Sequence, residues 1–230
     1  MKTVAIYNNK GGVGKTTLTA HLIYAADLAG VRTLGVAMDR QGDLPKWLSR
    51  GDAVKREGGV VQFSKHVAIV YSPEVPPSSA QGADLVVIDT PPDMAIASTV
   101  TADLWIAPCD GRMALEDLAN VLPTMLRGKA EVLVVFNRAE VGGVRALEAM
   151  HRAARAVPRL DVSTLAIPES AAIKRSGEFY MPAWEVPYGL DTQGARAIRA
   201  FADGVLARLG VVRASAPAAS APRSRVAGQG

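Results

Sequence analysis

The chain has 230 residues, of which 49% are hydrophobic, and a formal net charge of +4. This length suits a single domain with a large core. The sequence contains no run of about 18 apolar residues and therefore gives no indication of a membrane-spanning helix. A lone cysteine, Cys109, excludes an internal disulfide and fits a reducing cytosol.

The net charge is unevenly spread along the chain. It is −2 over residues 1–126, +3 over residues 127–210 and +3 over residues 211–230. A basic second half is typical of a chain that meets a polyanion, although solvated arginines are the commoner explanation for any single basic residue.

The first predicted strand–helix unit spans about residues 2–29, with the glycine-rich stretch Asn8–Thr17 between its two parts. An apolar run, then glycines, then Lys-Thr-Thr and a helix is the order of a phosphate-binding loop. Gly11, Gly12 and Gly14 let successive backbone N–H groups approach an anion, and the following helix directs its positive end to the same point.

Two side chains of this loop have a predicted role in chemistry. Lys15 is placed to reach the β- and γ-phosphate oxygens, and the Thr16 hydroxyl is placed to ligate a Mg²⁺ that bridges them. Thr17 is expected to pack or to form hydrogen bonds within its own segment. The predicted nucleotide contacts within the loop are Gly11, Gly12, Val13, Gly14, Lys15, Thr16 and Thr17.

A second lysine distinguishes this loop from the ordinary pattern. Asn9 stands where the first glycine is expected, and Lys10 follows it. The resulting Lys-Gly-Gly-x-Gly-Lys-Thr arrangement resembles the deviant Walker A motif of the ParA/MinD family of dimeric ATPases. The resemblance implies that Lys10 reaches across a nucleotide sandwich to the phosphates held by the other subunit.

The other predicted elements follow from runs of apolar residues and from helical periodicity. Predicted strands are 32–38, 60–63, 66–71, 84–89, 104–109, 131–136 and 163–167, and predicted helices are 44–48, 93–101, 111–126, 142–157 and 192–209. They predict an α/β fold with a single doubly wound, mostly parallel sheet flanked by helices, of the P-loop NTPase class with a deviant Walker A loop. Residues 1–210 form the predicted ATPase domain, and residues 211–230 a disordered Ala/Pro/Ser/Arg tail.

Two aspartates lie at or just after the carboxyl ends of predicted strands. Asp89 ends an apolar strand and is placed to hold a Mg²⁺-bound water, which resembles the Walker B aspartate of the family. Asp39 matches the second aspartate of the family's switch I and would position the attacking water, with a solvated turn residue as the alternative. Ala37 and Arg40 depart from the family pattern there.

The resemblance also implies an adenine pocket. Asn137 follows the strand 131–136 and would hydrogen-bond the base, with a strand-ending turn as the alternative. Pro168 and Glu169 lie in an Ile-Pro-Glu-Ser segment that resembles the family region beside adenine. Cys109 has no partner cysteine or nearby histidine and is predicted to be a packed thiol.

The leading functional hypothesis is a Mg²⁺-dependent ATPase of the ParA type. It would form an ATP-bound homodimer, bind DNA non-specifically and segregate or position a cargo in plasmid or chromosome partition, with hydrolysis stimulated by a ParB-like adaptor. It would be cytoplasmic and associated with the nucleoid. The candidate DNA contacts, each also explicable as a solvated charge, are Arg145, Arg152, Lys174, Arg175, Arg196 and Arg199.

Three alternatives remain open from the sequence. Small ParA-like ATPases also position protein complexes, such as chemotaxis arrays or carboxysomes, on the nucleoid. A P-loop metabolic ligase related to dethiobiotin synthetase would share the loop but gives Lys10 less purpose. A MinD-like membrane role is disfavoured, because residues 211–230 have no aromatic residue and no apolar helical stripe.

Overall fold

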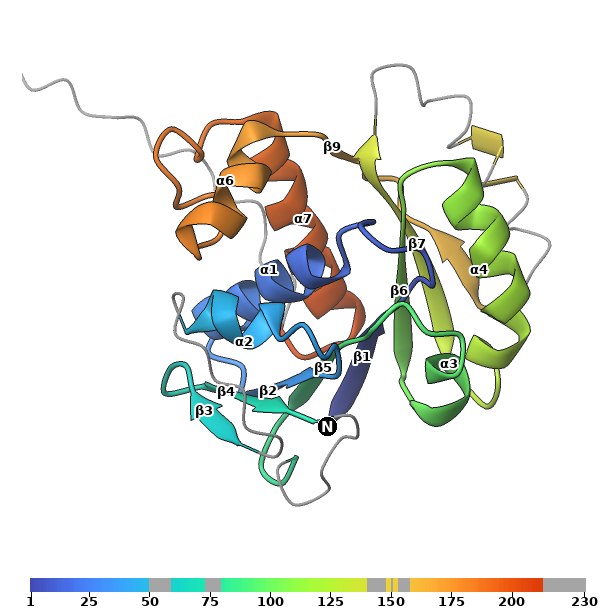
Figure 1. Ribbon diagram of the computed structural model, residues 1–230, viewed down its shortest axis with the longest axis horizontal. Helices are drawn as coiled ribbons and strands as arrows, with labels where there is room; N and C mark the ends of the chain where they lie inside the picture. Colours follow the sequence, from blue (N-terminus) through green and yellow to red (C-terminus); the bar gives the residue numbers. More distant parts are fainter. Residues whose placement is uncertain (50–58, 73–79, 140–147, 150, 153–157, 213–230) are drawn as a thin grey trace, which may run out of the picture.

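The computed structural model shows a layered α/β fold in which one mostly parallel sheet lies between two layers of helices (Figure 1). The structure describes residues 1–49, 59–72, 80–139, 148–149, 151–152 and 158–212. The predicted doubly wound, mostly parallel sheet is confirmed.

The strands form a sheet in the order β3-β4-β2-β5-β1-β6-β7-β8, and β9 pairs with β7. The antiparallel pair is β3 with β4, and the other pairings are parallel. Their bounds are β1 (Lys2–Ile6), β2 (Thr33–Ala37), β3 (Val60–Gln62), β4 (Val67–Tyr71), β5 (Leu85–Asp89), β6 (Leu104–Cys109), β7 (Glu131–Ala139), β8 (Leu160–Val162) and β9 (Ile167–Pro168).

The helices cover both faces of this sheet. In Figure 1, α1, α2, α6 and α7 lie on one face, and α3 and α4 lie on the other. Their bounds are α1 (Lys15–Leu28), α2 (Asp43–Leu48), α3 (Ile96–Thr99), α4 (Arg112–Met125), α6 (Ala171–Phe179) and α7 (Gln193–Arg208). None of the helices in the described part of the chain is long and apolar enough to span a membrane.

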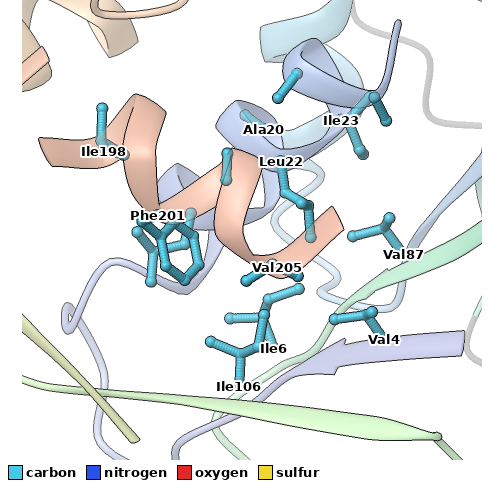
Figure 2. Close-up of a cluster of buried hydrophobic side chains, with 14 of the residues drawn as sticks. Val4, Ile6, Ala20, Leu22, Ile23, Val87, Ile106, Ile198, Phe201 and Val205 are labelled. Atoms are coloured by element: carbon cyan, nitrogen blue, oxygen red, sulfur yellow. The ribbon is translucent and has the colours of Figure 1, made fainter. Parts of the chain in front are cut away.

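The central strands are apolar on both faces because each face meets a helix layer. In β1, Val4 and Ile6 belong to the core beneath α1 and α7, whereas Ala5 belongs to the core on the α4 side. Figure 2 shows Val4 and Ile6 directed toward Leu22 of α1 and Val205 of α7. Two apolar cores therefore fix β1, and with it the start of the phosphate loop.

The parallel direction of the strands brings several polar segments to one edge of the sheet. The neighbours of β1 are β5 and β6, so the loop after β1 lies beside the carboxyl end of β5. Ligands of open α/β sheets bind outside these carboxyl ends, where the strand order reverses. The fold thus places the functional site at the loop that follows β1.

Two predicted elements differ from the structure. The helix predicted over residues 93–101 is limited to α3, because Asp93 accepts a turn hydrogen bond from the Ala95 N–H before the helix begins. The strand predicted over residues 163–167 is wrong. Two shorter strands, β8 and β9, flank a segment in which the Ser163 hydroxyl bonds the backbone of Leu165.

Two further predicted segments lie mostly outside the described residues. The helix predicted over 142–157 lies mostly outside them, with helical backbone at 148–149 and 151–152. Val211 and Val212 pack against the core, and the rest of the predicted tail lies outside the described residues. Helix α6 was not predicted from the sequence.

Candidate nucleotide-binding site

The phosphate loop joins β1 to α1 with the backbone that an anion cradle requires. Gly12 and Gly14 have φ values of 75° and 93°, in the left-handed region that favours glycine. Gly11 and Gly12 have open space where a side chain would begin. Gly14 lies directly before α1, so the first free N–H groups of the helix face the loop.

Asn8 anchors the loop to the neighbouring strand. Its buried side-chain amide donates to the carbonyl oxygens of Pro108 at 2.9 Å and Ala114 at 3.1 Å. Its Oδ1 accepts the Lys10 N–H at 2.9 Å. Both ends of the Asn8 side chain are thus used to hold the loop in shape, a role that the sequence did not reveal.

Lys15 points back into the loop that precedes it. The ammonium donates to the Lys10 carbonyl oxygen at 3.2 Å. Burial lowers the pKa of this ammonium below its usual value, and the carboxylates of Asp89 and Asp39 oppose that shift. A cation held at the floor of a glycine loop has the placement that phosphate oxygens require.

Lys10 is engaged within its own chain. Its Nζ lies 2.8 Å from Oδ1 of Asp110, the residue that follows β6. The two side chains are 33% and 18% exposed. Lys10 therefore lies at the rim of the site, on the side of α4, and does not point into the loop.

Two hydroxyls of α1 bind the Asp89 carboxylate. Thr16 Oγ1 donates to Oδ2 at 2.8 Å, and Thr19 Oγ1 to Oδ1 at 3.2 Å. Burial raises the pKa of Asp89 to about 7, although both hydrogen bonds lower it. The structure brings together the two residues predicted to hold Mg²⁺.

This donor set fits Mg²⁺ bound together with a nucleotide. Among the described residues, no group of three or more His, Cys, Asp or Glu side chains could hold a metal by itself. Mg²⁺ is commonly held by one or two protein oxygens, with phosphates and waters supplying the rest. The Thr16 hydroxyl and the Asp89 carboxylate match that pattern.

Asp39 lies at the carboxyl end of β2 and faces the same site. Its carboxylate accepts the Gln41 N–H at 3.0 Å, which shapes the turn before α2. It acts electrostatically on both Lys15 and Asp89. Ala37 is buried opposite Asp89, so no acidic side chain occupies the first switch position.

A cavity of 610 Å³ extends from the loop between β7, β9 and α6. The Asn137 amide donates to the Val13 carbonyl oxygen at 2.7 Å and lies directly against Gly14, where any side chain would collide with it. Thr17, Asn137, Pro168 and Glu169 all line this cavity. The predicted base-side residues are therefore gathered at one place, with Asn137 inside β7 and not after it.

Trp47 of α2 also lines the cavity and was not predicted. It meets the imidazole of His21 edge-to-face, and Trp184 makes the same kind of contact with that ring. An isolated tryptophan in a short amphipathic helix reads as core in a sequence. Only the packing of α2 on α1 shows that the residue belongs to the cavity wall.

The candidate DNA contacts do not share one environment. Lys174, Arg175 and Arg196 are exposed, and Arg199 forms an ion pair with Asp203 at 2.9 Å over the Trp184 ring. Arg152 is exposed beside a separate cavity, lined by His151 and Arg208. Arg145 lies outside the described residues.

Cys109 is fully buried at the end of β6. Burial raises the pKa of its thiol to about 12, with a further contribution from Asp110. The thiol is therefore protonated at neutral pH, as expected for a packed side chain.

A parallel sheet with a glycine loop, a buried loop lysine and a hydroxyl–carboxylate pair defines a P-loop nucleotide-binding protein. The sequence model of the CobQ/CobB/MinD/ParA nucleotide binding domain matches residues 4–183, and the chain belongs to this family.

Two curated relatives resemble the chain in sequence. "Maintenance of carboxysome distribution protein A" of Gloeobacter kilaueensis is 36% identical over 132 residues, which cover 55% of this chain and 56% of that protein. The match thus spans about half of that relative. Protein IncC of Escherichia coli is 22% identical over 255 residues, covering 93% of this chain and 71% of IncC.

Solved structures share the fold. The septum site-determining protein MinD of Pyrococcus horikoshii, complexed with Mg-ADP, aligns with a TM-score of 0.69 at 22% identity over 89% of this chain and 95% of that one. A putative plasmid partition protein of Borrelia burgdorferi bound to AMPPNP gives 0.63 at 16% identity over 90% and 99%.

Proposed function

We propose that this protein is a Mg²⁺-dependent ATPase that forms an ATP-bound dimer, binds DNA without sequence preference and positions a cargo on the nucleoid. An adaptor protein similar to ParB stimulates hydrolysis and release. The observation that carries the proposal is the pair of loop lysines: Lys15 within the cradle, and Lys10 at the rim, outside it.

Each residue of the site has its own role in this proposal. Lys15 and the loop N–H groups bind the phosphates, and the Thr16 hydroxyl and Asp89 carboxylate hold Mg²⁺ or its waters. Bound Mg²⁺ supplies charge neutralisation at the phosphate oxygens. Asp39, half-buried beside both groups, orients the attacking water, and Lys10 reaches the phosphates of the other subunit.

Exposed basic side chains support DNA binding, and acidic side chains near them in the sequence oppose it by repelling phosphate. Lys174 and Arg175 are exposed on α6, and Arg196 is exposed on α7. Exposed acidic residues lie close to them in the sequence, Glu178 and Asp191 among them. Binding that depends on a few phosphate contacts weakens steeply as the salt concentration rises.

The cargo has two candidate classes. The similarity to a carboxysome distribution protein favours a protein complex as cargo, whereas the fold shared with a putative plasmid partition protein is compatible with DNA cargo. ATP turnover measured with DNA and candidate adaptors of each class separates the two, since only the cognate adaptor accelerates hydrolysis.

Size-exclusion chromatography of the Asp39→Ala variant with ATP tests the proposal. The variant is expected to elute as a dimer with ATP, as a monomer with ADP, and to co-elute with DNA in low salt only when ATP is present. The double variant Asp39→Ala/Lys10→Ala is the matched control and is expected to remain monomeric. A monomer in every nucleotide state would remove the dimer from the proposal.

A further inference from the structure

Arg138 has an unusual backbone conformation at the edge of the nucleotide cavity. Its φ is 56°, in the left-handed region that costs energy for any residue with a Cβ atom. Its side chain is exposed. Packing in the core therefore gives no reason for an arginine at this position.

A β-bulge accompanies this conformation. Asn137 pairs with Ile167 of β9, and Ala139 pairs with Pro168, so one step along β9 corresponds to two along β7. Arg138 is the additional residue on β7. Bulges are frequent beside binding sites, where they change the direction of a side chain.

The bulge brings two consecutive residues to one cavity. In a regular strand, Asn137 and Arg138 would face opposite sides of the sheet. Here both line the 610 Å³ cavity that begins at Gly14. Because the Asn137 amide is fixed on the Val13 carbonyl oxygen, Arg138 is the adjustable member of the pair.

The guanidinium of Arg138 is available to a ligand. The described part of the chain gives it no hydrogen-bond or ion-pair partner. Arg159 provides the contrast: its φ is 66°, and its guanidinium donates to the carbonyl oxygens of Gly128 and Ala130. The unusual backbone of Arg159 thus serves the fold, whereas that of Arg138 serves no contact within the described chain.

We infer that Arg138 is a specificity residue for the nucleotide, kept in a strained conformation because this places a planar cation beside the base and ribose. A guanidinium stacks on ring faces and donates in a fixed fork, whereas an ammonium does not. The inference rests on the proposed nucleotide binding and assigns Arg138 the part of the nucleotide that Lys15 and Thr16 do not contact. Removal of the Arg138 side chain should therefore weaken ATP binding without lowering the stability of the fold.

Arg138→Gly tests this directly, because it removes the strain and the side chain together. Thermal unfolding and equilibrium binding of ATP and of inorganic tripolyphosphate are measured for each variant. The melting temperature is expected to stay the same or rise. The Kd for ATP is expected to increase about 5- to 10-fold, as for the loss of one cation–ring contact, while the Kd for tripolyphosphate stays unchanged.

Three further variants isolate the cause. Arg138→Asn, which tolerates the left-handed region, should behave like Arg138→Gly, and Arg138→Lys should recover only part of the ATP affinity. Arg159→Gly is the matched control: it also replaces a left-handed arginine, and it should lower the melting temperature with both Kd values unchanged.

Each contrary result contradicts one specific statement about Arg138 or about the proposed function. An unchanged ATP Kd in Arg138→Gly removes the inference. Equal weakening of ATP and tripolyphosphate makes Arg138 a phosphate ligand and overturns the assignment to base and ribose. A lower melting temperature of Arg138→Gly would show that the left-handed backbone of Arg138 is not strained. Absence of ATP binding by the wild-type protein overturns the proposed function itself.

Discussion

Lys10 and Asp110 form an ion pair within one chain, with 2.8 Å between Nζ and Oδ1. Asp110 follows β6, and the Asn8 amide donates to the carbonyl oxygen of Pro108 on the same strand. The lysine that distinguishes this loop is therefore held on the side of α4, away from its own cradle. A role for Lys10 across a dimer requires this ion pair to open.

Asp110→Asn is expected to favour the dimer, because it removes the charge that retains Lys10. A partly exposed ion pair contributes up to about 1 kcal/mol, so the ATP concentration for half-dimerisation should fall roughly 2- to 5-fold. Sedimentation velocity across an ATP titration measures this. The effect should vanish when Lys10→Ala is added, and persistence in that double variant would show that Asp110 acts through another group.

The two loop lysines are expected to differ in what their removal costs. Lys15→Ala removes the buried cation of the cradle and should abolish measurable ATP binding. Lys10→Ala should leave ATP binding within a few-fold of wild type while suppressing dimerisation and turnover. Isothermal titration with ATP decides the point, and an equal loss of affinity in the two variants would place Lys10 at its own nucleotide.

The two threonines on Asp89 offer a matched test of the Mg²⁺ site. Thr16→Ala should remove most of the Mg²⁺ dependence of ATP affinity, because it deletes the hydroxyl next to the loop, and Thr16→Ser should restore it. Thr19 is fully buried, and its single hydroxyl proton is shared between the Asp89 carboxylate and the Lys15 carbonyl oxygen, which lies 3.0 Å from Oγ1. Thr19→Ala should lower stability by about 1 kcal/mol with the Mg²⁺ dependence retained. Binding of ATP with Mg²⁺ or EDTA reads out the difference.

Much of the site was predictable because its signals are local. The glycines before Lys15 and the aspartate ending an apolar strand each follow from a few adjacent residues, and parallel topology brings them together. The amide of Asn137 contacts the loop through the Val13 carbonyl oxygen, and its hydrogen bond to the base stays a prediction. These predictions needed only the order of strands and the direction in which they run.

The parts that escaped prediction depend on contacts between distant segments. Nothing near Asp110 in the sequence indicates its ion pair with Lys10, 100 residues away. The bulge at Arg138 arises from the pairing of β7 with β9, which follows an incorrectly predicted strand. Trp47 lines the cavity because α2 packs on α1, where the indole meets His21, and no local sequence pattern indicates that packing.

His21 is a buried hydrogen-bond hub behind the phosphate loop. Its Nδ1 lies 2.7 Å from the Thr17 carbonyl oxygen, and its Nε2 accepts the Ala183 N–H at 3.0 Å. Trp47 and Trp184 meet the imidazole edge-to-face at 5.8 and 5.4 Å between ring centroids. Burial lowers the pKa of His21 to about 4, so the ring is neutral and Nδ1 carries the proton.

The folded state is expected to lose stability in acid through His21. In the unfolded chain a histidine takes up its proton near pH 6.5, whereas folded His21 does so only near pH 4. Between these values the unfolded state binds more protons, so the free energy of unfolding decreases as the pH falls, by roughly 3 kcal/mol over the whole window. The buried carboxyl of Asp89, whose pKa is raised to about 7, acts in the opposite direction.

The contribution of His21 is therefore measured as the difference in the free energy of unfolding between wild type and His21→Gln, from urea unfolding at several pH values from 7 to 4. This difference should narrow as the pH falls, because only the wild type carries the titrating ring. A difference that stays constant would mean that His21 has the same pKa in the folded and unfolded chain, and one that widens would mean that the pKa of His21 is raised by folding.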